Sequence, residues 1–210
     1  MPMSSAFHEE LEEPDADNLA ALAEDVVYRV PGCDDRMVRK AIRAAYRDFC
    51  RRSCALIGAS VVSVSREGCC AAPLRAAHIG CVVDCAVRAE ARGRELRADE
   101  WGFLGGVLRV SPRLLPEEGE LEVCVTCVEM PRIGSERASP SFLQRHGDAV
   151  VSGALARLLS MTGRAWSDPQ QAAQEATAYE NAVSEARARY MGGGGQSGGG
   201  LNYMKGGMVL

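Results

Sequence analysis

The spacing of apolar residues changes twice along this chain of 210 residues, and that change limits the folds open to it. Up to about residue 58, apolar residues recur three and four positions apart, as on the buried face of an α-helix. Between about 60 and 130 they alternate with polar residues, which is typical of β-strands, and from about 139 the helical spacing returns. The sequence therefore predicts an α+β fold. Two N-terminal and two C-terminal helices form a helical bundle, with an antiparallel β-sheet inserted between them.

Composition divides the chain further, into five parts. We expect a flexible acidic arm over residues 1–16, and a Gly-rich linker with an apolar docking tail over 192–210. Between these lie N-terminal helices over 17–58, the β insert over 59–138, and C-terminal helices over 139–191. The C-terminal helices are expected to pack against the N-terminal pair.

The second N-terminal helix has the most regular apolar face. Val38, Ile42, Ala45 and Phe49 follow a 4-3-4 spacing, which places all four on one side of the helix. This face is predicted to be buried.

The β insert is expected to contain four or five strands, four of them over residues 60–67, 78–88, 105–112 and 120–130. The connections are too short for crossover helices, so the strands should pair antiparallel. Alternation over 78–88 places Cys81 and Cys85 on the same face.

The joint between the two C-terminal helices has a clear chemical pattern. Gly163 suits the left-handed residue that commonly ends a helix. Asp168 can cap the next helix, with Pro169 at its first position and Gln171 where a capping box places Glu or Gln. Trp166 is therefore expected to be wedged between two helix ends.

Charge and hydropathy exclude several classes of protein. The formal charge of −4 argues against a protein that coats nucleic acid, because neutralising phosphates needs concentrated Lys and Arg. Nowhere do about 18 apolar residues follow one another, so no membrane span is expected. The acidic N-terminus does not resemble a signal peptide, which predicts a protein made and kept in a cytoplasm.

Catalytic signatures are missing from the sequence. There is no G-x-S-x-G, P-loop or dinucleotide fingerprint, so we expect no catalytic residue and no cofactor. Of the three histidines, His8 lies in the arm and His78 opens a strand. His146 lies on an apolar helical face, where a core histidine is the more common explanation.

Nine cysteines are present, and most are expected to be small buried hydrophobic residues. Cys124 and Cys127 are three apart in a strand, so they should point to opposite faces and cannot easily share a metal ion. Since no set of four ligands is evident, no metal site is predicted. The alternative is a disulfide across the sheet or between subunits, for which the loop residues Cys69 and Cys70 are the candidates.

A basic stripe runs along the second N-terminal helix and consists of Arg36, Lys40, Arg43, Arg47 and Arg51. It is either a solvated face or a surface that contacts acidic side chains of a partner subunit or DNA phosphates. The acidic cluster of the arm, in this copy or a neighbouring one, can supply such a partner. Its members are Glu9, Glu10, Glu12 and Glu13.

The C-terminal tail is the most informative feature for function. Nine residues of Gly, Gln and Ser over 192–200 span about 15–18 Å as a coil. An apolar segment after such a linker can bury itself in a neighbouring molecule or add a strand to it. The alternative is a tail without fixed structure. The expected docking residues are Leu201, Tyr203, Met204, Met208, Val209 and Leu210.

Two segments far apart in the sequence carry distinctive patterns. The C-terminal segment reads "GALARLLSMTGRAWSDPQQA" and continues into a long helix. The N-terminal segment reads "VPGCDDRMVRKAIRAAYRDFCRRS", in which an alanine is followed by Phe49 and Cys50. Both segments resemble head–tail connector (adaptor) proteins of tailed bacteriophages, and the resemblance covers roughly residues 20–55 and 140–190.

This resemblance implies a structural virion protein of the neck, made in the host cytoplasm. Such adaptors form a homo-oligomeric ring, usually of about twelve copies, beneath the portal protein. The ring gives the tail-terminator or tail-tube proteins a docking surface, and double-stranded DNA passes through its lumen without sequence-specific binding. The resemblance places Trp166 and the basic stripe at subunit contacts. The count of nine cysteines adds the hypothesis that thiols of neighbouring neck proteins oxidise into cross-links once the virion leaves the host.

Two alternatives remain at this point. One is a tail-completion or tail-terminator protein of the neck, which contacts the tail tube. The other is a DNA-binding packaging or regulatory protein, which uses the basic stripe to bind DNA.

Overall fold

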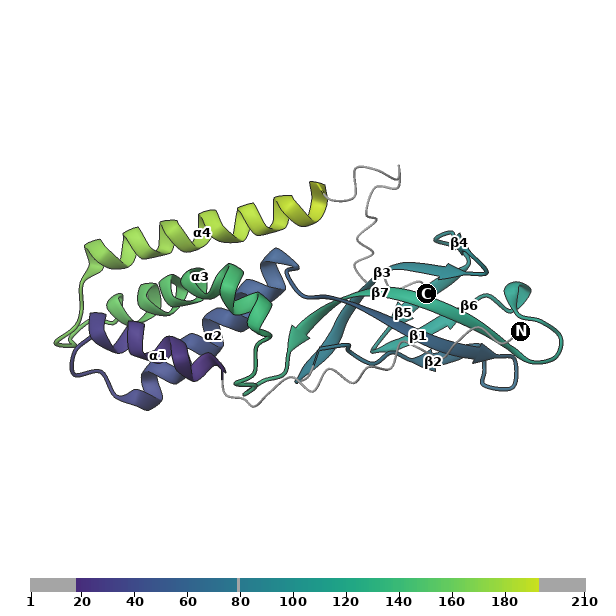
Figure 1. Ribbon diagram of the computed structural model, residues 1–210, viewed down its shortest axis with the longest axis horizontal. Helices are drawn as coiled ribbons and strands as arrows, with labels where there is room; N and C mark the ends of the chain where they lie inside the picture. Colours follow the sequence, from purple (N-terminus) through teal and green to yellow (C-terminus); the bar gives the residue numbers. More distant parts are fainter. Residues whose placement is uncertain (1–17, 79, 193–210) are drawn as a thin grey trace.

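A computed structural model describes residues 18–78 and 80–192 of the chain. The molecule is elongated, with a helical unit at one end and a β unit at the other (Figure 1). The described part of the chain begins in the helical unit, passes through the β unit and returns to the helical unit. The α+β class predicted from the sequence is confirmed.

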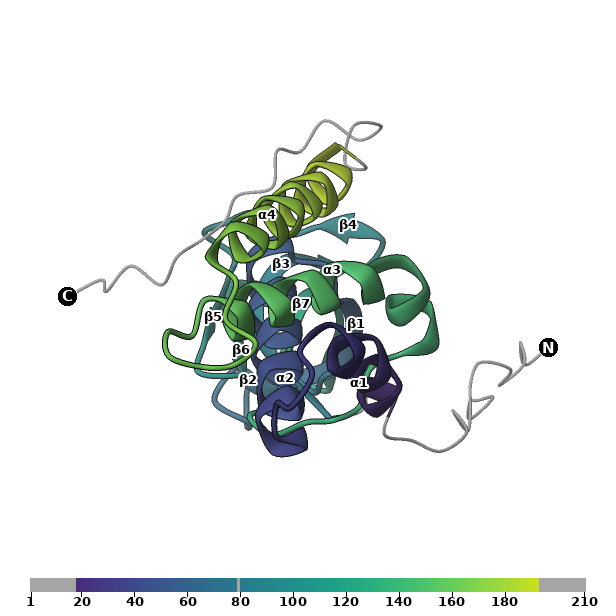
Figure 2. The same ribbon diagram turned by 90° about the vertical axis from the view of Figure 1, so that its left-hand side faces the viewer.

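Four helices form the helical unit: α1 (Asn18–Arg29), α2 (Asp35–Ser53), α3 (Pro140–Leu159) and α4 (Pro169–Gly192). α3 lies between α4 on one side and α1 and α2 on the other, as seen from the helical end of the molecule (Figure 2). The two C-terminal helices thus pack against α1 and α2, although the whole β unit separates the two pairs in the sequence.

Side-chain caps define where the long helices begin. The Asp34 carboxylate accepts a hydrogen bond of 2.9 Å from the Arg36 N–H at the start of α2. The Ser139 hydroxyl accepts one of 3.2 Å from the Phe142 N–H at the start of α3. At its other end α2 stops at Cys54, which has a left-handed conformation with φ of 56°. The chain then leads directly into the β unit.

The predicted apolar face of α2 forms the centre of the helical core. Val38, Ile42, Ala45 and Phe49 are at most 1% exposed, which confirms the prediction. The Phe49 ring meets Phe142 of α3 edge-on, with ring centroids 5.9 Å apart. Burying one such aromatic side chain contributes about 1.5–3 kcal/mol, so this core is the main reason the four helices stay together.

Two antiparallel sheets form the β unit, where the sequence predicted one. The four-stranded sheet has the order β1-β7-β3-β4, and the three-stranded sheet has the order β2-β6-β5. The antiparallel pairing is confirmed, but the expectation of a single sheet is wrong. β2 and β5 span only three and four residues, too few to produce a periodic signal. The strands are β1 (Ile57–Ser65), β2 (Ala71–Pro73), β3 (Cys81–Ala91), β4 (Arg94–Glu95), β5 (Trp101–Leu104), β6 (Val107–Val110) and β7 (Glu120–Pro131).

The two sheets share a second hydrophobic core, separate from that of the helices. Val64 of β1, Leu108 of β6, and Val123 and Val125 of β7 are fully buried there. The longer connection between β6 and β7 carries a short 3₁₀-helix, Pro112–Leu114.

Two β-bulges in β3 overturn the prediction that Cys81 and Cys85 share a face. The pairing with β7 shifts between Val83 and Cys85, because Val83 lies opposite Glu129 and Cys85 lies opposite Val128. Asp84 is the extra residue, so the side chains that follow it change sides. Cys81 contributes to the helical core, whereas Cys85 lies on the opposite face of the sheet.

The close contact of α3 with α2 and α4 predicts opposite effects for two glycine substitutions. A Cβ atom at Gly153 would lie 2.7 Å from the Tyr179 ring of α4 and 3.1 Å from Cβ of Ala45. We expect Gly153→Ala to lower the free energy of unfolding by about 1–3 kcal/mol, measured by urea denaturation.

Gly147→Ala on the same helix is the matched control. Its Cβ atom would meet only Leu22, at an ordinary 3.5 Å. It should raise the stability by up to about 1 kcal/mol, because alanine favours a helix. Equal stabilisation by both substitutions would contradict the packing described here.

Candidate interaction surfaces

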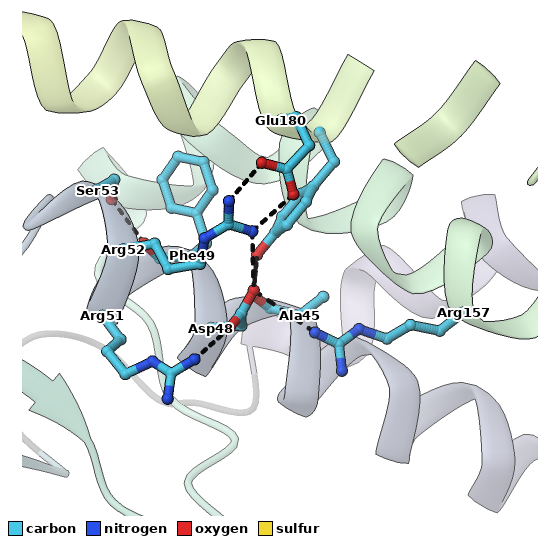
Figure 3. A network of polar contacts seen from close by, with 9 residues as sticks. Ala45, Asp48, Phe49, Arg51, Arg52, Ser53, Arg157 and Glu180 are labelled. Atoms are coloured by element: carbon cyan, nitrogen blue, oxygen red, sulfur yellow. Dashed lines mark hydrogen bonds and ion pairs between the residues drawn. The ribbon is translucent and has the colours of Figure 1, made fainter. Parts of the chain in front are cut away.

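An ionic and hydrogen-bonded network around Asp48 ties three helices together (Figure 3). The Tyr179 hydroxyl of α4 lies 3.0 Å from Asp48 Oδ2 and 3.2 Å from the Ala45 carbonyl oxygen. Arg51 and Arg157 approach the same carboxylate to 2.9 and 3.7 Å, the second from α3. One carboxylate on α2 therefore fixes the positions of both C-terminal helices.

A second pair extends this network along the outside of α2 and α4. Arg52 pairs with the Glu180 carboxylate through both of its terminal nitrogens, one of them at 2.7 Å. The guanidinium also lies over the Tyr179 ring, 5.9 Å from its centroid. Burial, followed by the nearby charge of Asp48, raises the pKa of Tyr179, so this hydroxyl remains a donor at physiological pH.

The five residues of the basic stripe predicted on α2 differ in their exposure and in their ion pairs. Arg43 pairs with Glu136 at 2.5 Å, and Arg51 pairs with Asp48 on its own helix. Arg47 is half-buried, and its Nε atom has no hydrogen-bond partner in the described part of the chain. Arg36 and Lys40 are exposed and form no ion pair within residues 18–78 and 80–192. A contact of these five residues with another subunit stays a prediction.

The joint between α3 and α4 has the predicted geometry. Gly163 has a φ of 73°, and the Asp168 carboxylate accepts hydrogen bonds of 3.1 and 3.0 Å from the N–H groups of Gln170 and Gln171. This confirms the cap at the start of α4.

Trp166 lies in this joint half-buried, packed against the helical core. Arg164 lies 5.8 Å from the centroid of its ring. The indole Nε1 is buried and finds no partner among the described residues. The tryptophan therefore braces the joint, while its predicted role in a subunit contact stays a prediction.

All nine cysteines lie in the described chain as free thiols. Cys124 is exposed and Cys127 is buried, so the expected opposite orientation is confirmed. Burial raises the pKa of the Cys127 thiol to about 12, so it stays protonated at neutral pH. Cys69 is exposed and Cys70 half-buried in the turn before β2, and no disulfide joins them in this structure.

His146, for which the sequence predicted a core position, lies half-buried against two aromatic rings of the helical core. Its ring lies 4.9 Å from Phe49 and 5.2 Å from Phe142, measured between centroids. Burial, with smaller contributions from Arg189 and Arg145, lowers its pKa, so the ring is neutral at physiological pH. It serves packing within the helical unit.

A buried carboxylate in β7 was not among the sites found from the sequence. Glu129 is 1% exposed and accepts hydrogen bonds of 2.6 and 2.9 Å from the N–H groups of Ala77 and His78. The His78 ring nitrogen Nδ1 lies 2.9 Å from the same carboxylate. A Cβ atom at Gly58 would lie only 1.8 Å from it, so only glycine fits at that point of β1.

Opposing effects set the protonation of Glu129. Burial acts to raise its pKa, but the hydrogen bonds from the His78 side chain and from the two backbone N–H groups outweigh burial. The resulting pKa lies below the ordinary value, and the carboxylate remains charged. It anchors the segment before β3 to the place where the helical and β units meet.

Two neighbouring hollows open at this junction. Their volumes are about 630 and 510 Å³, and Gly80 and Arg132 line both. Arg75 and His78 line the larger hollow, and Arg137 lines the smaller one. The junction therefore presents a mainly basic surface.

The remaining predictions concern parts of the chain that the structure does not describe. The acidic arm and the six apolar tail residues lie outside the described residues, which end at Gly192.

None of the described helices is long and apolar enough to cross a membrane. No group of three metal-ligating side chains is present within residues 18–78 and 80–192.

In comparisons with known proteins, no protein-family model and no curated protein matches the chain.

The buried carboxylate predicts a pH-dependent contribution to stability. Since the pKa of Glu129 is lower in the folded chain than in an unfolded one, the carboxylate stabilises the fold above about pH 4.3. This contribution is lost as the pH falls through the folded-state pKa. We expect Glu129→Gln to lower the free energy of unfolding at pH 7 by about 1–3 kcal/mol and to flatten its decline below about pH 5.

Urea denaturation at a series of pH values measures both effects. Glu122→Gln, at an exposed position of the same strand, is the control and should change the stability by less than about 0.5 kcal/mol. Identical pH profiles for wild type and Glu129→Gln would show that the buried carboxylate does not stabilise the fold.

Proposed function

We propose that the chain is a structural protein of a tailed-phage virion, a head–tail connector that forms a ring beneath the portal. The observation that carries this proposal is the resemblance of residues 20–55 and 140–190 to that family. These two segments are distant in the sequence, yet they build one hydrophobic core. A shared core explains how two segments so distant in the sequence can together carry one family pattern.

Ring formation needs two different surfaces on each copy, because head-to-tail contacts close into a ring. The helical unit and the β unit lie at opposite ends of an elongated molecule (Figure 1). Exposed Arg36 and Lys40 on α2 supply charge for one contact, and the braced joint around Trp166 supplies a rigid edge. In this proposal about twelve copies meet through these surfaces.

The apolar tail gives the ring its attachment to a neighbour. Residues 201–210 dock into the portal protein or an adjacent copy, and the glycine-rich linker provides the reach. The tail-terminator or tail-tube proteins bind the other side of the ring. The protein works by assembly, without catalysis or a cofactor.

The charge of the chain suits a ring through which DNA slides. The net charge of −4 repels phosphates, whereas an extended basic lining would hold them. Two of the five stripe residues, Arg43 and Arg51, are already paired with carboxylates of this chain. This pairing makes a DNA-binding packaging or regulatory protein the weaker alternative. A tail-completion protein of the same neck differs only in which neighbour receives the tail.

The tail provides the test of this proposal. The double variant Leu201→Asp, Tyr203→Asp should keep the helical content of the wild type but lose attachment to portal-bearing heads, because charge opposes burial of the segment. Sedimentation of purified heads with the added protein measures attachment. The control Ser197→Asp, Asn202→Asp adds the same charge at polar positions and should attach like the wild type. Wild-type attachment of both variants would overturn the proposed role of the tail.

A further inference from the structure

The arginines of the junction surface form no ion pairs within the described chain. Arg75, Arg132 and Arg137 are exposed, and none pairs with a carboxylate in residues 18–78 and 80–192. Beside them lies Ile133, an apolar side chain that is 84% exposed. Three cations and an exposed isoleucine around two adjoining hollows fit an acidic peptide that also carries apolar side chains.

The first described helix, α1, begins beside this surface. The N–H of Leu19, at the start of α1, donates a hydrogen bond of 3.3 Å to the carbonyl oxygen of Glu136. Glu136 lines the smaller hollow next to Arg137, and its carboxylate is already occupied by Arg43. Residues that precede α1 therefore start beside guanidinium groups that lack carboxylate partners.

Residues 1–17, which precede α1, are acidic and therefore complement the basic surface. Residues 1–17 contain six acidic residues and no Lys or Arg, so the other residues carry 22 acidic and 24 basic side chains, a formal charge of +2. Leu11 supplies an apolar side chain among the acidic residues, and Phe7 lies just before them. The negative charge of the whole protein thus comes from this one segment.

We propose that the acidic segment 8–17 of the same chain occupies the basic surface at the junction, with its carboxylates paired to Arg132 and Arg137. Eight residues between Asp17 and Glu9 reach about 15 Å as a coil and about 26 Å when extended. This reach covers the hollows from the start of α1. Attachment to the same chain gives an effective concentration on the order of millimolar, which favours an intramolecular contact over one between copies.

The occupied surface loses its attraction for phosphates. Uncovered, the three guanidinium groups would be a site for the DNA backbone. One consequence rests on the connector function proposed above. With the basic surface covered by the segment, duplex DNA passes through the ring without binding to it. The contact itself forms in the isolated chain, so its test does not need an assembled ring.

Zero-length carbodiimide cross-linking of the full chain tests the contact directly, because it joins a lysine to a carboxylate that touches it. Lys40 and Lys205 are the chain's only lysines, so Arg137→Lys introduces a new reactive site while keeping the charge. Mass spectrometry should find Lys at position 137 joined to Glu9, Glu10, Glu12, Glu13 or another carboxylate of the segment.

Arg92→Lys is the matched control. Arg92 follows the far end of β3, and that strand begins at the hollow and runs for 11 residues, about 35 Å. This variant should give no link to the segment. The absence of a link at position 137, or an equal yield at position 92, would overturn the proposal.

A mixture of ¹⁵N-labelled and unlabelled chains identifies the source of the segment. Linked peptides that carry one label throughout show that the segment comes from the same chain, whereas pairs with mixed labels assign the surface to a neighbouring copy and overturn this proposal.

Binding of a short DNA duplex at low salt gives a second readout. The variant Glu9→Gln, Glu10→Gln, Glu12→Gln, Glu13→Gln should bind at least about tenfold more tightly than wild type, and adding Arg132→Glu and Arg137→Glu should abolish the gain. Unchanged binding by the four-glutamine variant would contradict a covered surface.

Discussion

The close approach of α3 to both α2 and α4 is the constraint on which the rest of the structure depends. Gly153 allows it, because any side chain there would meet Tyr179 and Ala45. Tyr179 can then reach Asp48, and the carboxylate in turn holds arginines of α2 and α3. Two chain segments separated by the whole β unit are thereby fixed as one body. The β unit consequently extends from this body as an insert between two fixed ends.

The junction between the two units is organised by a different kind of interaction. Glu129 is charged and buried, and it holds the backbone of Ala77 and His78 with hydrogen bonds. Around it lies a basic surface, next to the first residues of α1. Such a surface adjoins both the rigid helical body and the sheets.

The sequence predicted the helices well and the β unit only in outline. Helix faces and caps follow from local rules, so the buried face from Val38 to Phe49 and the Asp168 cap are as expected. The β-bulges in β3 depend on pairing with β7, which no local pattern reveals, and two strands are too short for a periodic signal. A signal for Glu129 did exist. Residue 129 falls on the same face of the strand as Leu121, Val123, Val125 and Cys127, because every second residue points to the same side. A glutamate on that buried face indicates a hydrogen-bonded carboxylate.

The proposed function requires several copies of the chain at one place in a viral particle. Averaged cryo-electron microscopy of the head–tail junction, in virions from cells that produce this chain, tests directly whether these copies are present. The account predicts a closed ring of this fold beneath the portal, with the apolar C-terminal segment inserted into an adjacent protein. Intact virions whose necks lack this chain would contradict it.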